Sequence, residues 1–269
     1  MWRARLSEVR YHLLSNNSSR YNLDHIDLLI DLHRAHPHLG PGGAAQTRQA
    51  IALSGLRGRT NLRIADLGCG TGASTLVLAE ELDAAITAVD RFPAFLATLT
   101  ERAAQRGLGR KIQTVAASFD SLPFPDASLD AIWSEGAIYN LGFAAGVAAW
   151  RRYLKPGGVL AVSELTWLHP SPPRPLWDHW KAEYPEVATA AEKLAVLESH
   201  GFTPIGYFPL PVECWLDNYY GPLQASFSAF LQRHGDAAQA IVDAQTAEIA
   251  LYTAHQAHIS YGFYLAQRL

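Results

Sequence analysis

The sequence has 269 residues, of which 49% are apolar and 17% charged, and its formal net charge is -3. This composition is sufficient for one large core, and the dispersed basic residues argue against a nucleic-acid-binding protein. The only cysteines, Cys69 and Cys214, show no metal-ligand spacing, so we expect neither a disulfide framework nor a metal site. No apolar stretch approaches a membrane span and no signal peptide is recognisable, so we expect a cytoplasmic protein.

The N-terminal part of the chain is predicted to be helical. Apolar residues recur at helical intervals over residues 22–36, and Pro37 ends this pattern. A Gly/Pro-rich segment follows and leads into a second helix over residues 44–53. We expect residues 1–60 to form an N-terminal helical cap and residues 61–269 to form one larger domain.

Strand and helix patterns then alternate. The predicted strands cover residues 62–67, 85–89, 111–116, 129–133, 158–165, 204–211 and 259–269. The predicted helices between them cover residues 73–82, 93–106, 143–154, 187–200, 222–233 and 236–256. This order predicts a doubly wound α/β fold with a Rossmann-like, seven-stranded and largely parallel sheet. We expect a proline-rich lid over about residues 170–185 and a helical insertion over about residues 221–257, before the last strand.

A glycine-rich turn joins the first predicted strand to its helix. Gly68, Gly70 and Gly72 follow Asp66, and Asp90 ends the next strand 24 residues after Asp66. Glycine permits positive φ and lets a ligand approach the backbone. A carboxylate ahead of the turn would repel a pyrophosphate and attract an ammonium group, and Asp90 could hold ribose hydroxyls. The two acids suit a nucleoside with a cationic amino-acid tail, such as S-adenosylmethionine.

These residues carry a family resemblance. The stretch "DLGCGTG" resembles the first motif of the class I S-adenosylmethionine-dependent methyltransferases, and "AVD" at residues 88–90 resembles the second. Residues 117–143 and 150–164 are similar to the methyltransferases of ubiquinone and menaquinone biosynthesis. From about Leu39 onward, the chain is more similar still to an uncharacterised bacterial group that shares "WSEGAIYN".

The resemblance implies a set of residues that bind S-adenosylmethionine and its product, S-adenosylhomocysteine. Asp66 would face the methionine end, Asp90 and Arg91 the ribose, and Ser118 and Phe119 the adenine. Many relatives have an acid where Ser118 stands, and Asp120 could take over its hydrogen bond to adenine. The implied cofactor-binding residues are Asp66, Gly68, Gly70, Gly72, Asp90, Arg91, Ser118, Phe119, Asp120 and Ser134.

Two Ser-Glu pairs end neighbouring predicted strands and place Glu135 and Glu164 near the donor. Alternatively, either glutamate caps a helix or pairs with a nearby arginine. For orienting or deprotonating the acceptor, the candidate catalytic residues are Glu135, Tyr139, Asn140 and His169. Aromatic residues in the predicted lid and late loop suggest an acceptor pocket, although they could simply pack the loops onto the core. These aromatic residues are Trp167, Trp177, Trp180, Trp215, Tyr219 and Tyr220.

The sequence therefore predicts an S-adenosylmethionine-dependent methyltransferase that acts on a small molecule. An amine or a planar hydroxyl compound is the favoured acceptor, and the predicted acceptor pocket contains Glu164, Trp167, Trp215, Tyr219 and Tyr220. The alternatives are a nicotinamide-dependent oxidoreductase and a catalytically silent S-adenosylmethionine-binding module. We expect no nucleic-acid partner and no membrane span, and either a monomer or a homodimer.

Overall fold

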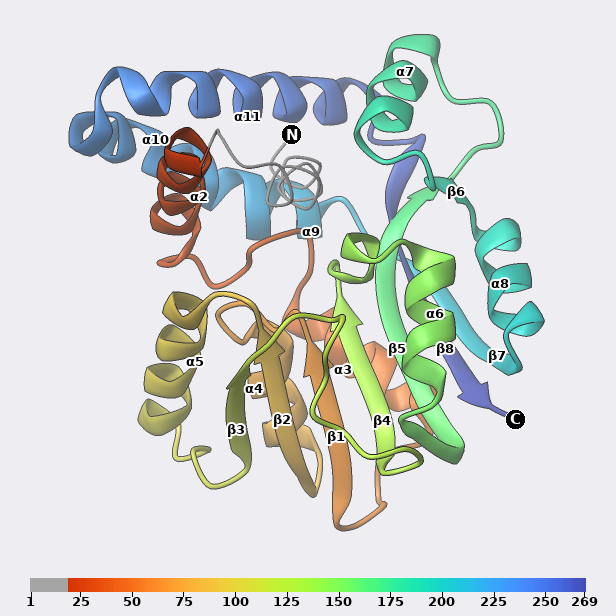
Figure 1. The fold of residues 1–269 in the computed structure, drawn as a ribbon. Coiled ribbons are helices and arrows are strands. Elements are labelled where there is room, and N and C mark those ends of the chain that lie inside the picture. Colours follow the sequence, from red (N-terminus) through yellow and green to blue (C-terminus); the bar gives the residue numbers. More distant parts are fainter. Residues whose placement is uncertain (1–18) are drawn as a thin grey trace.

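The computed structural model describes residues 19–269, with side chains from His25 onward. The first 18 residues of the predicted cap lie outside the described residues. Figure 1 shows a twisted central sheet with helices on both faces and a further group of helices across one end. The predicted doubly wound α/β fold is therefore confirmed.

The described strands form one eight-stranded sheet in the order β3-β2-β1-β4-β5-β8-β7, with the short β6 paired to β5. The strands are β1 (Leu62–Leu67), β2 (Ala84–Asp90), β3 (Ile112–Ala116), β4 (Leu129–Glu135), β5 (Leu154–Trp167), β6 (Ala188–Thr189), β7 (Phe202–Pro209) and β8 (Ile259–Arg268). Strands β1 to β5 run parallel, whereas β8 is antiparallel to β5 and to β7. The chain reverses its direction of winding between β1 and β4, which places a crevice at the carboxyl ends of these strands.

Strands β5 and β7 begin earlier than the sequence predicts. Strand β5 begins at Leu154, because Leu154 pairs with Leu129 before a register shift in β4, so the preceding helix ends at Arg151. Strand β7 begins at Phe202, directly after the positive-φ turn at Gly201. The seven predicted strands form the main path of the sheet, and β6 adds a two-residue eighth strand beside the end of β5.

Helices cover both faces of this sheet. Helices α3 (Ala44–Ser54) and α4 (Ala73–Glu81) pack their apolar residues on one face, against side chains such as Ile64 and Trp133. Helices α6 (Phe143–Arg151) and α8 (Ala190–Ser199) pack on the other face, against Ile132 and Leu160. Helix α5 (Pro93–Gln105) covers β2 and β3. Because both faces are buried, the central strands are almost continuously apolar.

The remaining helices lie across the carboxyl ends of the parallel strands (Figure 1). They are α2 (Ser19–His33), α7 (Arg174–Glu183), α9 (Glu213–Trp215), the π-helix η2 (Leu216–Tyr220), α10 (Gly221–His234) and α11 (Asp236–His255). Of these, α10 and α11 lie in the predicted insertion, α9 and η2 come directly before it, and α7 lies in the predicted lid. Among residues 19–269, no helix combines the length and apolar character needed to cross a membrane.

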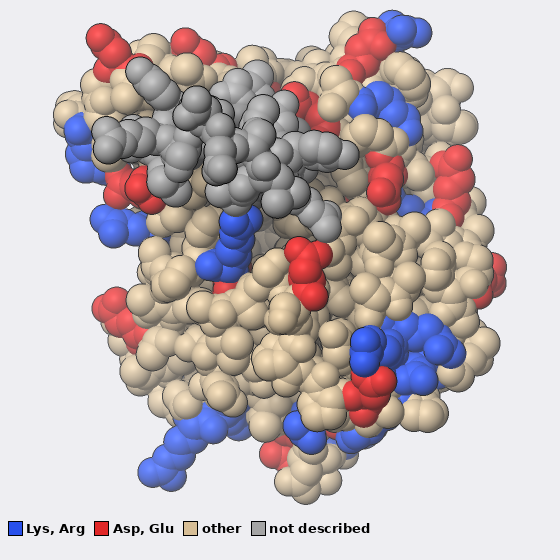
Figure 2. Space-filling model, viewed as in Figure 1, with Lys and Arg blue, Asp and Glu red and all other residues tan. Residues whose placement is uncertain are grey.

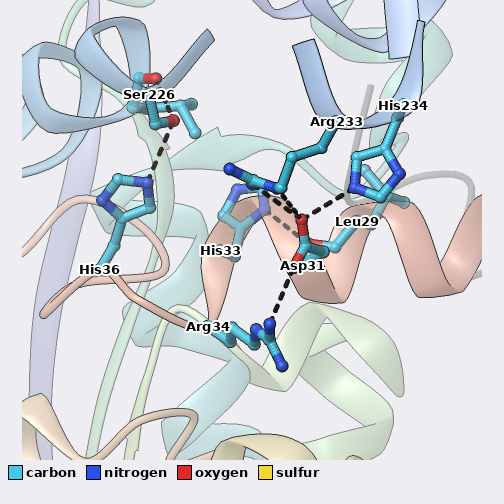
Figure 3. Close-up of polar contacts among 9 residues, drawn as sticks. Leu29, Asp31, His33, Arg34, His36, Ser226, Arg233 and His234 are labelled. Atoms are coloured by element: carbon cyan, nitrogen blue, oxygen red, sulfur yellow. Dashed lines mark hydrogen bonds and ion pairs between the residues drawn. The ribbon is translucent and has the colours of Figure 1, made fainter. Parts of the chain in front are cut away.

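An ion-pair cluster joins the N-terminal cap to this insertion (Figure 3). Asp31 on α2 lies 2.8 Å from a guanidinium nitrogen of Arg233 and 2.9 Å from Nε2 of His234, both at the end of α10. Arg34 also pairs with Asp31, at 3.1 Å. Burial alone would raise the pKa of Asp31, but the hydrogen bonds from His234 and Arg233 hold it below its usual value. The cap and the insertion are thus joined above the sheet.

Candidate functional site

A pocket opens at the carboxyl ends of β1, β2 and β4, where sheet topology predicts a ligand site. Its floor is the glycine-rich turn, and its roof is the segment of residues 37–42 that joins α2 to α3. The rest of the lining comes from residues 90–95, 117–120 and 135–141. Cap and sheet domain therefore both contribute to the pocket.

The glycine-rich turn has the positive φ values that its sequence predicts. Gly68, Gly70 and Gly72 have φ of 76°, 54° and 91°. Close packing within the protein adds a second reason for glycine. A Cβ at Gly68 would lie 2.3 Å from the Ala137 Cβ, and one at Gly72 would lie 2.1 Å from a Leu99 methyl carbon. Both positions therefore exclude a side chain even before any ligand is considered.

Asp66 lies behind the turn and is absent from the pocket lining. Its side chain is fully buried, and Oδ2 accepts hydrogen bonds from the hydroxyls of Ser74 and Thr75, at 2.8 and 2.6 Å. Burial raises the pKa of Asp66 to about 6. Its Oδ1 has no hydrogen-bond partner among the described residues. From this position Asp66 stabilises the first turn of α4 through its hydrogen bonds to Ser74 and Thr75, and its carboxylate places negative charge beneath the pocket.

Asp90 ends β2 and lines the pocket. One carboxylate oxygen accepts from the backbone N–H of Gly70 at 3.0 Å, and the other accepts from that of Phe92 at 2.9 Å. Burial raises the pKa of Asp90 above its usual value. The two backbone bonds fix the carboxylate at the rim of the turn, and each oxygen keeps a lone pair for a further donor, as a ribose diol would require.

The predicted adenine side is mainly aromatic. Phe119, Phe92 and Phe95 line the pocket together with Arg91, Ser118 and Asp120. Ser118 donates a 3.2 Å hydrogen bond to Asp120, so the serine and the acid form one polar group at this edge. Ser134 is different: it is buried outside the lining, and its hydroxyl donates to the backbone carbonyl of Leu67.

Glu135, at the end of β4, is a partly buried acid of the pocket lining. Its Oε1 accepts hydrogen bonds from Nε1 of Trp133 and from the hydroxyl of Thr47, both at 2.8 Å. Burial raises the pKa of Glu135 to about 7, and the two hydrogen bonds limit that rise. The carboxyl group is therefore held in place and titrates near neutral pH, as a group that orients or deprotonates a ligand would.

Two other candidate catalytic residues share this lining. Tyr139 and Asn140 lie in the short 3-10 helix η1 (Ile138–Asn140) after β4, and both line the pocket. His169 does not: its side chain is exposed beyond β5, where Nδ1 accepts from the backbone N–H of Ser171 and the ring contacts His258. The fold therefore places Glu135, Tyr139 and Asn140 together and leaves His169 apart.

The second Ser-Glu pair, Ser163 and Glu164, does not place its glutamate in the pocket as the first pair does. Strand pairing aligns Glu135 with Ser163, so Glu164 is one residue out of step and points to the opposite face of the sheet. Glu164 is 1% exposed and its Oε1 accepts from the Leu165 backbone N–H. It lies outside the pocket lining.

The predicted aromatic rim is largely part of the core. Trp167, Trp180, Trp215, Tyr219 and Tyr220 are buried and belong to the main apolar cluster. Trp215 stacks on Tyr252 with ring centroids 4.3 Å apart, and its indole N–H donates to Ser260. Trp177 is 38% exposed, and the guanidinium of Arg174 lies over its ring. None of these aromatic residues contributes to the pocket lining.

The roof of the pocket is not among the site residues that the sequence predicts. His38, Leu39 and Gly42 line it, whereas the segment "HPHLGPGG" predicts only a break between two helices. Leu39 packs directly on Gly70, because a Cβ at Gly70 would lie 2.7 Å from a Leu39 methyl carbon. A second Gly/Pro-rich segment just before a helix was the available signal.

The pocket lining has a negative balance of charge. The lining contains three carboxyl groups, from Asp90, Asp120 and Glu135. Among the described lining residues, Arg91 is the one arginine or lysine. On the molecular face in Figure 2, basic and acidic side chains are interspersed, with one denser basic group at the lower right. The lining therefore favours a ligand with a positive charge over one with a pyrophosphate.

Comparisons with known proteins agree with this geometry. Residues 65–162 match the family model described as a methyltransferase domain. The chain is 29% identical to the O-methyltransferase cnsE of Penicillium expansum, over 61% of this chain and 59% of that protein. It is 32% identical to the malonyl-[acyl-carrier protein] O-methyltransferase of Dechloromonas aromatica, over 49% of this chain and 48% of that protein. The chain thus spans about half of the length of the curated relatives it matches.

A solved structure supports the fold over most of the chain. The S-adenosylmethionine-dependent methyltransferase from Geobacter sulfurreducens, determined in complex with S-adenosyl-L-homocysteine, superposes with a TM-score of 0.79. The superposition covers 90% of this chain and 98% of the Geobacter protein, at 19% sequence identity. The resemblance to class I S-adenosylmethionine-dependent methyltransferases is confirmed, and the match to the family model covers residues 65–162. The closer bacterial group and the boundary at residue 60 stay predictions.

Proposed function

We propose, on the premise that residues 65–162 form a methyltransferase domain, that this protein transfers a methyl group from S-adenosylmethionine to a small molecule. The acceptor carries a hydroxyl or amine nucleophile. The observation that supports this most strongly is the pocket at the glycine-rich turn, where Asp90, Asp120 and Glu135 surround an otherwise largely apolar lining.

The donor set of the pocket fits an adenosyl sulfonium compound. Asp90 would accept hydrogen bonds from the ribose hydroxyls, and Phe119 with Ser118 and Asp120 would hold the adenine. The backbone of the turn from Gly68 to Thr71, which lines the pocket, would face the amino-acid portion, whereas Gly72 lies outside the lining. Asp66 acts from behind the turn through its charge and its bonds to α4. When bound, S-adenosylmethionine supplies an electrophilic methyl group.

The chain's part in the reaction is to place the acceptor and to handle its proton. Methyl transfer requires the acceptor atom in line and about 3 to 3.5 Å from the methyl carbon, so placement supplies much of the rate. Glu135, fixed by Trp133 and Thr47, is the group that orients the acceptor. Tyr139 and Asn140 line the same space and complete the contact surface.

The names of the relatives include oxygen, carbon and nitrogen as the methylated atom, so they leave a hydroxyl acceptor possible without selecting it. Two of the curated relatives are named O-methyltransferases, one of them for a malonyl group on acyl-carrier protein. The partly buried Glu135 carboxyl group, which titrates near neutral pH, also suits a hydroxyl, which must lose a proton during the transfer. We therefore favour a hydroxyl acceptor, with an amine as the alternative.

Two other functions are separable by experiment. A nicotinamide-dependent oxidoreductase would bind a pyrophosphate against the glycine-rich turn, where the surrounding carboxylates oppose it. A silent binding module would bind S-adenosylmethionine without turnover. The cytoplasmic location and the monomeric or dimeric state stay predictions.

Calorimetric titration with S-adenosylhomocysteine and, separately, with NADH is the direct test. We expect binding of the sulfur nucleoside in the micromolar range and weak or no binding of NADH. The Asp90→Ala variant should lose binding at least about 10-fold, because the ribose loses its acceptor. Tight NADH binding, or failure of S-adenosylhomocysteine to bind, would contradict the proposal.

A further inference from the structure

The roof of the pocket is fastened to the glycine-rich turn. The Thr71 hydroxyl donates to the backbone carbonyl of His36 at 2.9 Å, and it also lies 3.3 Å from that of Pro37. Arg102 donates to the carbonyls of Ala35 and His36 and to that of Thr71. These bonds fix the backbone of residues 35–37 relative to the glycine-rich turn, and His38 is the next residue along the roof.

His38 faces the pocket and makes no side-chain hydrogen bond or ion pair in the described part of the chain. It lines the pocket and is about half-buried. Burial and the nearby positive charge of Arg102 lower its pKa below the usual histidine value. The imidazole is therefore neutral at pH 7 and has ring nitrogens available to accept a proton.

His38 and Glu135 converge on one point. A Cβ built on Gly42 would lie 3.7 Å from Nδ1 of His38 and 3.6 Å from Oε2 of Glu135. Glu135 uses Oε1 for its bonds to Trp133 and Thr47, so Oε2 is the oxygen that faces this point. A neutral base from the roof and a fixed carboxyl group from the end of β4 thus border the same small volume.

We propose that His38 is the catalytic base of the methyl transfer, and that His38 and Glu135 together receive a hydroxyl-bearing acceptor; this inference rests on the proposed function. Glu135 accepts a hydrogen bond from the acceptor and orients it. The acceptor oxygen loses its proton to the imidazole and forms a bond to the methyl carbon as the bond from that carbon to sulfur breaks. The bonding pair stays on sulfur, so a neutral thioether and a methyl ether or ester are formed, and one proton remains on His38.

A hydroxyl acceptor explains this arrangement better than an amine does. An amine that arrives neutral has a free lone pair and needs no base before the transfer. A hydroxyl becomes a strong nucleophile only as its proton leaves. Two proton-accepting groups that face one point are therefore suited to a substrate whose O–H bond must break.

The first part of the experiment needs no acceptor. Diethylpyrocarbonate, which acylates neutral imidazoles, is applied with and without S-adenosylhomocysteine, and modified histidines are identified by peptide mass spectrometry. We expect His38 to be modified and to be protected at least about 10-fold by the nucleoside, because both occupy one pocket. His255, half-buried at the end of α11 and outside the pocket lining, should react equally in both conditions. An unreactive or unprotected His38 would overturn the proposal.

The second part measures turnover with matched acceptors. The probes are 4-nitrophenol, catechol and 4-hydroxybenzoate, each paired with its amine analogue, and S-adenosylhomocysteine formation is the readout. His38→Asn should lower kcat for hydroxyl probes about 10²-fold or more, while calorimetric binding of S-adenosylhomocysteine changes less than about 3-fold. His255→Asn should match the unsubstituted protein.

The pH profile separates a base from a structural residue. In the unsubstituted protein, kcat should rise with pH, and the midpoint of this rising limb of the profile should lie below the ordinary histidine pKa. His38→Asn should remove the rising limb. The charged groups that face His38 are Arg102 from α5 and Glu135 from β4, with Asp90 and Arg91 in the same lining. The Arg102→Gln variant should therefore shift the limb to higher pH without removing it.

A steric variant tests the geometry. Gly42 does not have positive φ, and its added Cβ would make only ordinary contacts, so Gly42→Ala should fold. Its methyl group would occupy the space between His38 and Glu135 and should lower turnover of hydroxyl probes at least about 10-fold. Unchanged turnover in Gly42→Ala or His38→Asn, or no turnover of any hydroxyl probe by a protein that binds S-adenosylhomocysteine, overturns this inference. Absence of nucleoside binding would instead overturn the proposed function.

Discussion

The hydroxyl of Thr47, in helix α3, donates a 2.8 Å hydrogen bond to Oε1 of Glu135, at the carboxyl end of β4. Thr47 comes from the N-terminal cap and Glu135 from the central sheet, so this bond links the two predicted units at the pocket. The Glu135 carboxyl group is partly buried, so this bond has greater energetic weight than a bond on the surface. The cap therefore helps to set the position and the ionisation of the acid.

Thr47→Val should uncouple this link with little change in side-chain shape. Without the hydroxyl, the Glu135 carboxylate loses one of two stabilising bonds, so its pKa should rise further. We expect kcat to fall about 10-fold, in line with the loss of a hydrogen bond to a charged group. Binding of S-adenosylhomocysteine, measured by calorimetry, should change little. Thr47→Ser keeps the hydroxyl and serves as the control; equal activity of both variants would contradict this role.

Glu135→Gln should stabilise the ligand-free protein at alkaline pH. The folded-state pKa of about 7 lies above the ordinary carboxyl value of 4.5, so the folded protein holds this proton more tightly than the unfolded chain does. Stability is therefore lost as pH rises from about 4.5 to 7, and the full loss, about 3 kcal/mol, persists above pH 7. Glutamine can still accept from Thr47 and Trp133 but carries no charge.

Denaturant unfolding of both proteins at several pH values from 4.5 to 8 measures this effect. The stability gain of Glu135→Gln should be near zero at pH 4.5 and largest at pH 8, while methyl transfer is lost. Such a gain with loss of activity is typical of a functional group held at an energetic cost. A variant that is less stable than the unsubstituted protein at pH 8 would show that the carboxylate is structural.

The fold was predictable because local and long-range signals agree along most of the chain. Each strand that precedes a glycine-rich or acidic turn, such as the one that ends at Asp90, has both an apolar pattern and a clear terminator. The antiparallel pairing of β8 with β5 and the short β6 depend on contacts between distant segments, which periodicity does not report.

The site was less predictable because it depends on register and on packing direction. Glu135 and Glu164 each follow a serine near the end of a strand, yet a one-residue offset between β4 and β5 places them on opposite faces of the sheet. The sequence predicts Trp215 and Tyr220 at a loop surface, but the short helix α9 and the π-helix η2 place them in the core. The sequence of the roof, with His38, indicated only a break between helices.

Gly68→Ala should destabilise the protein through two separable effects. The added Cβ would lie 2.3 Å from the Ala137 Cβ, and φ of 76° is unfavourable for alanine. We expect a loss of about 2 to 4 kcal/mol, from overpacking and from the left-handed backbone together. Gly58→Ala is the matched control, because Gly58 has φ of 83° and nothing within 4 Å of its added Cβ. It should show the backbone cost alone, about 1 kcal/mol.

The double variant Gly68→Ala with Ala137→Gly isolates the steric effect. It removes the closest contact and leaves the backbone strain, so it should regain at least about 1 kcal/mol relative to Gly68→Ala. Thermal unfolding with and without S-adenosylhomocysteine measures both stability and binding. If Gly68→Ala and Gly58→Ala have the same effect, close packing with Ala137 is not what requires glycine at residue 68.

Asp31→Asn should loosen the N-terminal cap from the insertion, because Asp31 is the shared partner of Arg34, Arg233 and His234 (Figure 3). A network of partly exposed ion pairs contributes about 1 kcal/mol, and salt screens it. The pKa of Asp31 is held below its usual value, so this contribution is present at neutral pH and is lost as pH falls below the ordinary carboxyl range. The variant should therefore differ most from the unsubstituted protein at neutral pH and low salt, and least at pH 3 or in about 1 M salt.

Asp178→Asn breaks the exposed pair with Arg174 and is the control for surface charge alone. Chemical unfolding at two salt concentrations measures the difference, and a loss for Asp31→Asn that is no larger than that for Asp178→Asn would show that the cluster does not hold the cap in place.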